Sequence, residues 1–398
     1  MKYYISQNEA VQGGIVLDDV ILTKDLPTSA GSKMLDGYMS LFDAEVVNRL
    51  TAAGYAVSGK ANIGEMAIDL LGESSYYGPV TDGDSLIGAS VALVREGKAY
   101  AAVGMDANGT PRRAAALGGG FCMKPTYGTV SRFGTVSLAC SGETITVTAA
   151  TLDAVKAVLD CLIGHDDKDG TSLPEEKCLL AKSGAPATPK RVALAKGLLE
   201  STAPDMQERV RFVRETFAKN GIEVAEIDDS LLLTAKAAWN VLMSAELCNN
   251  VSRYDGVKYG YRTKNYKTID ELYTNSRTEA FGPLLKTAIL FGSETLSTEN
   301  YMKVYDKALR MRRVISERLC EILSSFDAIL LPAASKSAFT LADTAAKYTL
   351  AYDENLYTAP ASISGLPAIA FGGVQLIGKA FSENTLYALA ELYEKEGK

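Results

Sequence analysis

The stretch from Gly104 to Gly128, GMDANGTPRRAAALGGGFCMKPTYG, constrains the fold more than any other part of the chain. Glycine at this density reaches positive φ and lets backbone approach backbone or a ligand closely. Small side chains, an arginine pair and a closing Lys-Pro-Thr-Tyr-Gly complete the stretch. It therefore predicts a buried, tightly turned loop system around which the rest of the chain is organised.

Composition and charge exclude several classes of protein. The 398 residues are 47% hydrophobic and 22% charged, which is typical of a globular protein with ample core-forming material. The net charge of −7 argues against direct nucleic-acid binding, although a partner protein could supply a basic surface. No apolar run is long enough for a membrane span, and the start, MKYYISQNEA, lacks the apolar core of a signal peptide. We expect a cytoplasmic protein with no membrane association.

Cysteine and histidine give no sign of a metal or redox centre. Six cysteines are scattered without a CxxC pair, so neither a zinc site nor a disulfide framework is indicated. A Ser-His-Asp triad could be built only around the single histidine, His165, which follows an amphipathic helix and is interpreted as structural. We expect buried free thiols, no metal and no cofactor.

Alternating strand and helix patterns predict an α/β fold whose sheet is covered by helices. The expected strands are 15–21, 55–62, 129–137, one opening at 191, and 328–332; the expected helices are 43–53, 63–71, 149–164, 205–220, one beginning after Asp228 to Ser230, and 297–325. The length alone would suggest two or three domains, but large α/β proteins often fold as one, so we expect one domain over 1–398, with a linker-like segment at 170–189 inside it.

The glycine-rich stretch and the residues after it resemble the signature of the amidase signature family, and its amidotransferase A subunits most of all. The matching residues are Gly104, Asp106, Gly109, Arg112, Lys124 to Gly128, Val130 to Arg132 and Gly134, and the likeness continues through His165-Asp166, Arg253 to Gly256 and Gly365 to Pro367. The resemblance implies the fold of that family: a mixed central β-sheet covered by helices on both faces. Here it would be trimmed at the N-terminus and in a C-terminal hairpin, where Phe371-Gly372-Gly373 passes directly into Val374.

Members of the family hydrolyse amides with a serine nucleophile, a second serine on a cis peptide, and a lysine. At the matching positions this chain carries Thr110, Leu86 and Asp18. Leu86 cannot relay a proton, and a carboxylate in place of the lysine makes a nearby hydroxyl harder to ionise. Successive strand residues point to opposite faces, so only one of Asp18 and Asp19 can face this site. All three catalytic positions are changed.

Other family positions are retained or altered in ways that suggest roles. Asp106, Arg112 and Lys124 are interpreted as the scaffold of the signature, a buried charge network. The positions that we expect to affect binding of a small amide or amino acid are Asn108, Gly109, Arg277 and Asn355. Asn108 adds a side chain where the family places backbone donors for the oxyanion.

Two functional hypotheses remain open. In the first, the chain is catalytically inactive or strongly impaired and acts by binding or assembly, with an amidotransferase-type subunit, an active paralogue or a small amide or amino-acid ligand. In the second, it is an amidase or glutaminase with a rebuilt site. Thr110 would then be the nucleophile, Ser85 the relay and Asp18 a base acting through water. The sequence does not separate the first hypothesis from a decayed copy without function.

Overall fold

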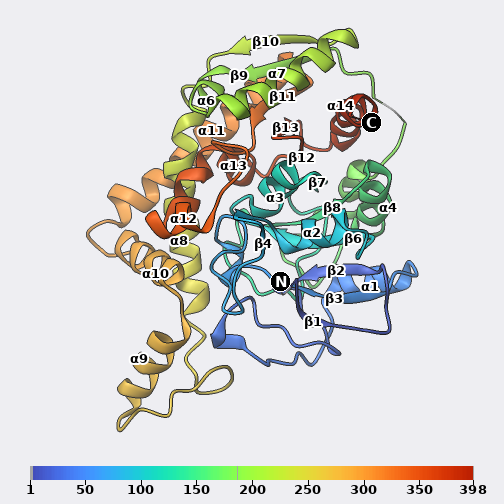
Figure 1. Ribbon diagram of the computed structural model, residues 1–398. Helices are drawn as coiled ribbons and strands as arrows, with labels where there is room; N and C mark the ends of the chain where they lie inside the picture. Colours follow the sequence, from blue (N-terminus) through green and yellow to red (C-terminus); the bar gives the residue numbers. More distant parts are fainter. Residues whose placement is uncertain (1–2, 186, 398) are drawn as a thin grey trace.

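One large mixed sheet organises the computed structural model, which describes residues 3–185 and 187–397 (Figure 1). The sheet runs from the N-terminal strands at the bottom of Figure 1 to β9 and β10 at the top. Its eleven described strands follow the spatial order β1 (Tyr4–Gln7), β3 (Val57–Ala61), β2 (Ile15–Asp18), β6 (Ala101–Asp106), β8 (Thr144–Ala149), β7 (Phe121–Lys124), β12 (Ala368–Phe371), β13 (Val374–Gly378), β11 (Ala328–Pro332), β9 (Arg191–Ala195) and β10 (Glu223–Ile227). Strand β2 is parallel to β3 and β6, and β9 is parallel to β10 and β11, whereas the central pairs are antiparallel.

Helices cover both faces of this sheet, which confirms the predicted fold class (Figure 1). In chain order they are α1 (Glu45–Ala52), α2 (Ala89–Arg95), α3 (Thr110–Gly118), α4 (Leu152–Leu162), α5 (Glu175–Cys178), α6 (Lys196–Glu200), α7 (Pro204–Lys219), α8 (Ala235–Val251), α9 (Ile269–Ala280), α10 (Pro283–Thr295), α11 (Asp306–Ser325), α12 (Leu341–Ala346), α13 (Leu350–Ser364) and α14 (Glu383–Glu396). Helices α2 and α3 pack against the central strands on the side that carries the candidate site. Among the described residues, no helix is both long enough and apolar enough to cross a membrane.

The segment 64–74, the acidic loop, is not the helix predicted over 63–71. It contains one short 3-10 turn, Glu65–Ala67, in which Met66 and Ala67 have φ of 55° and 52°. The carboxylate of Asp69 accepts the backbone N–H of Gly72 and Ser74, and that of Glu73 accepts those of Leu70 and Leu71. Such local bonds offer the backbone an alternative to the helical ladder, and here they prevail.

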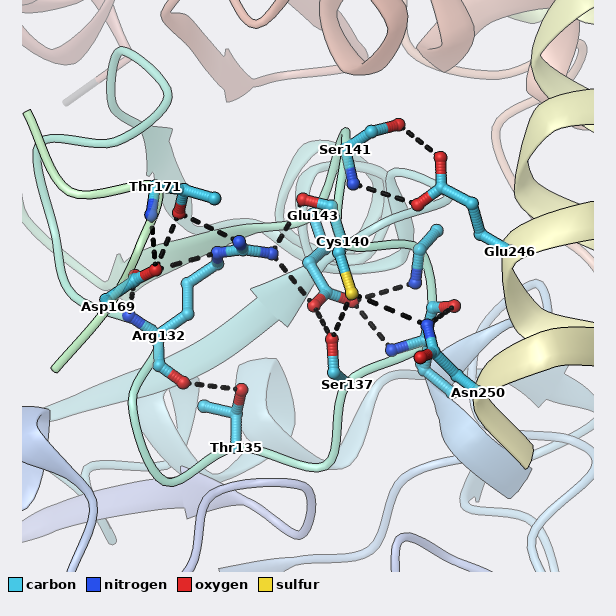
Figure 2. A network of polar contacts seen from close by, with 12 residues as sticks. Arg132, Thr135, Ser137, Cys140, Ser141, Glu143, Asp169, Thr171, Glu246 and Asn250 are labelled. Atoms are coloured by element: carbon cyan, nitrogen blue, oxygen red, sulfur yellow. Dashed lines mark hydrogen bonds and ion pairs between the residues drawn. The ribbon is translucent and has the colours of Figure 1, made fainter. Parts of the chain in front are cut away.

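The strand predicted over 129–137 is also wrong, since this segment forms only isolated bridges to Ile21 and Ile163. Side chains of the segment also anchor it to its neighbours (Figure 2). The Arg132 guanidinium donates to the Cys140 carbonyl at 2.7 Å, to Glu143 at 3.0 Å and to Thr171 at 2.8 Å. Backbone bonds to Val20, Leu22 and Gly164 pair single groups of the segment without forming a ladder, so the segment stays irregular.

Several predictions near the C-terminal half are confirmed, and one needs correction. The predicted helix over 205–220 is α7, the end of the predicted helix over 297–325 is α11, and the predicted strand over 328–332 is β11. The carboxylate of Asp229, predicted to cap the following helix, accepts the backbone N–H of Gly197 and Leu198 at the start of α6. It therefore joins two distant segments.

The segment 170–189, predicted to be linker-like, contains α5 and a 3-10 turn, Leu179–Ala181. Thr171 donates to Asp169 and accepts from Arg132, which anchors the start of the segment to the network of Figure 2. Residue 186 lies outside the described residues.

Candidate functional site

Two of the three positions that the resemblance matches to the family's catalytic residues face one small cavity. Asp18 ends β2, Thr110 begins α3, and both line a cavity of about 40 Å³ together with Asp69, Ser90 and Gly104. One water needs roughly 10–15 Å³ of such space. The cavity therefore holds a few waters, and the wall would have to move to admit a whole amino-acid amide.

The Asp18 carboxylate is buried and fully engaged within the protein. It accepts the Ser90 hydroxyl at 2.7 Å and the Met105 backbone N–H at 3.3 Å. Burial raises the pKa of Asp18 to about 6, against the lowering effect of these two hydrogen bonds. A Cβ at Gly104 would lie 2.3 Å from the carboxylate, so only glycine at that position leaves room for it.

Asp19 points away from the cavity, as the alternation of side chains along a strand predicts. Its carboxylate accepts the Ser29 backbone N–H at 2.9 Å and lies 3.9 Å from the Lys60 ammonium. Burial lowers the pKa of Lys60 to about 8, while Asp19 opposes that shift. The two adjacent carboxylates therefore have separate surroundings.

The Thr110 hydroxyl is bound to the acidic loop. It donates to the Asp69 carbonyl at 2.7 Å, and the Asn108 side-chain amide donates to the Ile68 carbonyl at 2.8 Å. The Arg113 guanidinium reaches the Leu70 carbonyl at 3.2 Å. Three consecutive carbonyls of the loop thus accept from the start of α3 and from a residue just before it. These contacts hold the acidic loop against the start of α3, beside the half-buried Thr110.

Leu86, at the third changed position, packs elsewhere. It lies in the short hairpin of β4 (Thr81–Asp82) and β5 (Ser85–Leu86), and its side chain joins an apolar cluster with Leu70, Val91 and Phe339. Ser85 and Leu86 line a neighbouring hollow that opens to solvent. The structure brings Asp18 and Thr110 together on one cavity and places Ser85 on the other space.

Three of the four predicted binding positions converge beside α3. Gly109 has a φ of 80°, and a Cβ there would lie 2.3 Å from the Thr358 side chain. The Trp239 indole N–H donates to the Asn108 side-chain oxygen at 2.9 Å, and the Asn355 amide lies 3.3 Å from the same atom. Asn108 is therefore held by polar contacts on both sides.

Arg277, the fourth predicted binding residue, lies apart on α9. Its guanidinium donates to the carbonyls of Val251 and Tyr254, each at 2.9 Å, and stacks 4.9 Å from the Phe281 ring centre. These contacts tie α9 to the end of α8. The arginine does not line the cavity.

The residues interpreted as scaffold form a buried polar core. Arg112 binds both carboxylate oxygens of Asp106, at 2.7 and 3.0 Å, and donates to Gln375 at 2.6 Å. Lys124 donates to the Leu366 carbonyl at 2.9 Å, and burial lowers the pKa of Lys124 to about 7, aided by nearby Arg112. Gln375 belongs to β13, and Arg112 also donates to the Ser362 hydroxyl of α13 at 3.0 Å, so these contacts connect the glycine-rich stretch to both elements.

Sequence reasoning missed Asp69 and Ser90, which complete the cavity. Asp69 lay inside a predicted helix, although Gly64, Gly72 and the serines after Glu73 are signals of a loop. Ser90 carries no sequence signal of its own, and its hydroxyl donates to Asp18. Among the described residues, no group of three or more His, Cys, Asp or Glu side chains is placed to hold a metal ion.

The chain is similar to known proteins in both sequence and structure. A family model described as Amidase matches residues 14–387. The chain is 36% identical over 404 residues to the A subunit of glutamyl-tRNA(Gln) amidotransferase of Coxiella burnetii (strain RSA 493 / Nine Mile phase I), covering 96% of this chain and 83% of that protein. It is 33% identical over 398 residues to the protein of the same name from Francisella tularensis subsp. novicida (strain U112). That match covers 96% of this chain and 82% of the Francisella protein. The crystal structure of the Thermotoga maritima protein of that name superposes with a TM-score of 0.82 at 29% identity, covering 99% of this chain and 87% of that one.

Proposed function

The chain belongs to the amidase signature family, and from this premise we propose that it is a non-catalytic member that acts by binding or assembly. The residues that face the cavity carry this proposal. Members of the family use a serine, a second serine and a lysine, and the retained core around Arg112 keeps the fold without those three.

The single observation that supports the proposal most is the hydrogen bond from the Thr110 hydroxyl to the Asp69 carbonyl. A nucleophilic hydroxyl must give its proton to a base, and a backbone carbonyl cannot take it. The described lining of the cavity includes the carboxylates of Asp18 and Asp69 and no lysine, arginine or histidine. Negative charge beside the hydroxyl disfavours an alkoxide.

The surroundings of the expected oxyanion site support the same proposal. Stabilising a tetrahedral intermediate requires backbone N–H donors aimed at the developing charge. The Gly109 N–H already donates to the Asp106 carboxylate at 3.0 Å, and the Asn108 side chain adds bulk beside it. A donor used in this way is not free to stabilise an oxyanion.

Assembly is the more specific part of the proposal. The relatives from Coxiella and Francisella are named as the A subunits of an amidotransferase. We propose that this chain pairs with another subunit of such an enzyme or with an active paralogue.

A second candidate function is favoured by one observation, that Asp18 and Thr110 line the same cavity. With a pKa of about 6, the Asp18 carboxylate could accept a proton through a water at neutral pH. The acidic loop would have to move for a substrate to enter. This candidate is an amidase that uses Thr110 as its nucleophile.

Ammonia release from glutamine, asparagine and acetamide separates the two candidates. The purified chain is compared with Thr110→Ala and with Thr148→Ala, which removes another hydroxyl from the cavity wall. We expect all three proteins to match the background. Turnover lost in Thr110→Ala and kept in Thr148→Ala would refute the proposal.

Tagged wild type and Thr110→Ala purified from native cells should carry the same stoichiometric partner and the same activity.

A further inference from the structure

A second hollow adjoins the cavity at Thr110. It has a volume of about 280 Å³ and is open to solvent. Leu71, Gly88 and Ala114 form a wall shared by the two spaces. The remaining lining comes from three directions: the β4–β5 hairpin with Arg95, the later part of α3, and Arg209 of α7 with Ser337 and Ala338.

Two tight connections shape this hollow. The β4–β5 hairpin is anchored by the Leu86 backbone N–H, which donates to the Phe339 carbonyl at 2.7 Å. On the opposite side, β12 and β13 are joined by the two-residue turn Gly372-Gly373, where φ is 53° and 91°. A Cβ at Gly373 would lie 2.6 Å from the Arg209 side chain. The tight turn thus lets the stem of Arg209 pass over it.

The charges of the hollow are unbalanced in favour of an anion. Arg95 is paired with Asp82 at 3.0 Å. Arg209 is half-buried, and within residues 3–185 and 187–397 it forms no ion pair or side-chain hydrogen bond. The packing of its stem on Gly373 accounts for the aliphatic part of the side chain and leaves the guanidinium without a partner. A planar guanidinium binds carboxylate or phosphate oxygens in pairs.

The rest of the lining limits the size and polarity of a ligand. Leu86, Leu117 and Ala338 present apolar surface, and Ser85 supplies a hydroxyl on the hairpin side. The nearby Ser337 hydroxyl is already used, since it donates to Asp205. An anion with a short apolar part would match one free cation, one hydroxyl and apolar walls.

We propose that this hollow binds a small organic anion, carrying one carboxylate or phosphate group, with Arg209 as its principal partner. The inference rests on the proposed function in that it names the ligand class of a binding protein. It places Leu86 and Ser85 in the wall of a ligand site, where the family would have its second serine.

Calorimetric titration tests the proposal at constant ionic strength, with butyrate and inorganic phosphate as separate probes and chloride as the background anion. The variants are Arg209→Gln, Ser85→Asp, which adds negative charge to the opposite wall, and the control Arg211→Gln, which removes the same charge from an exposed position on α7. We expect saturable binding of at least one probe by wild type and Arg211→Gln, weakened tenfold or more in Arg209→Gln and Ser85→Asp.

The probe that binds identifies the carboxylate or the phosphate as the ligand group. Equal affinity in all four proteins, or no saturable binding of either probe by wild type, would overturn the proposal. Thermal unfolding of each variant excludes loss of fold as the cause. Because binding is measured without turnover, a negative result here leaves the ammonia-release result unaffected, and the reverse also holds.

Discussion

Gly109 shows at the scale of one residue why the start of α3 tolerates so little change. It precedes the helix with a φ of 80°, a conformation that costs a residue with a Cβ about 1–2 kcal/mol. It also faces Thr358, whose hydroxyl donates to the Asn108 carbonyl at 2.9 Å. Conformation and space therefore both require glycine here.

Replacing Gly109 with alanine should destabilise the protein more than replacing Gly119, at the other end of the same helix. Gly119 has a similar φ of 87°, but no atom lies within 4 Å of the position that a Cβ would take there. The two variants share the conformational cost, and Gly109→Ala adds overpacking of about 1–3 kcal/mol. Urea unfolding measures the difference. Equal losses of stability in the two variants would show that Thr358 yields freely.

The acidic loop is the element that determines which groups contact Thr110. It places Asp69 over Thr110, and it is folded around its own carboxylates. Burial raises the pKa of Glu73 to about 8, and the charge of Asp69 adds to that shift. Burial likewise raises the pKa of Glu65 to about 7. The buried conformation of the loop is therefore most stable when the carboxyl groups of Glu65 and Glu73 are protonated.

Stability should depend on pH through Glu73. Its pKa is about 8 in the folded chain against an ordinary 4.5, so its stabilising contribution is complete below about 4.5 and is lost as pH rises through 8. The lowered pKa values of Lys60 and Lys124 change stability with pH in the opposite direction. The pH dependence of the total unfolding free energy therefore does not isolate Glu73. The stability of wild type relative to Glu73→Gln should fall between pH 6 and pH 9. A constant difference over that range would contradict the assigned shift.

Sequence reasoning succeeded where local pattern and burial agree, as in α7 and β11, and failed in the acidic loop. There the apolar residues between Glu65 and Leu71 have helical spacing, but Asp69 and Glu73 bind the backbone N–H groups that a helix would use. The family resemblance matched Asp18 to a site position, and strand alternation allowed only one of Asp18 and Asp19 to face the site. Its partner Ser90 could not be, because the contact depends on how α2 packs against β2.

At the scale of the whole molecule, the order of the sheet assembles the site from distant segments. Strand β2 lies parallel to β6, so Asp18 comes beside Gly104 and, through α3, near Thr110. The β4–β5 hairpin and the Gly372-Gly373 turn lie at the same end of the fold and border the open hollow. The family resemblance predicted this architecture. The hollow itself depends on side chains such as Arg209 that carry no sequence signal.

Intact-protein mass spectrometry after exposure to an activated ester, p-nitrophenyl acetate, tests most directly whether Thr110 is a nucleophile. Such an ester acylates even weakly activated hydroxyls. Thr110→Ala is the reference for acylation elsewhere on the surface. We expect identical acetylation of wild type and Thr110→Ala, because the Thr110 hydroxyl donates its proton to the Asp69 carbonyl and no base in the described cavity lining is placed to take it. One acetyl group gained rapidly by wild type and absent from Thr110→Ala would contradict it.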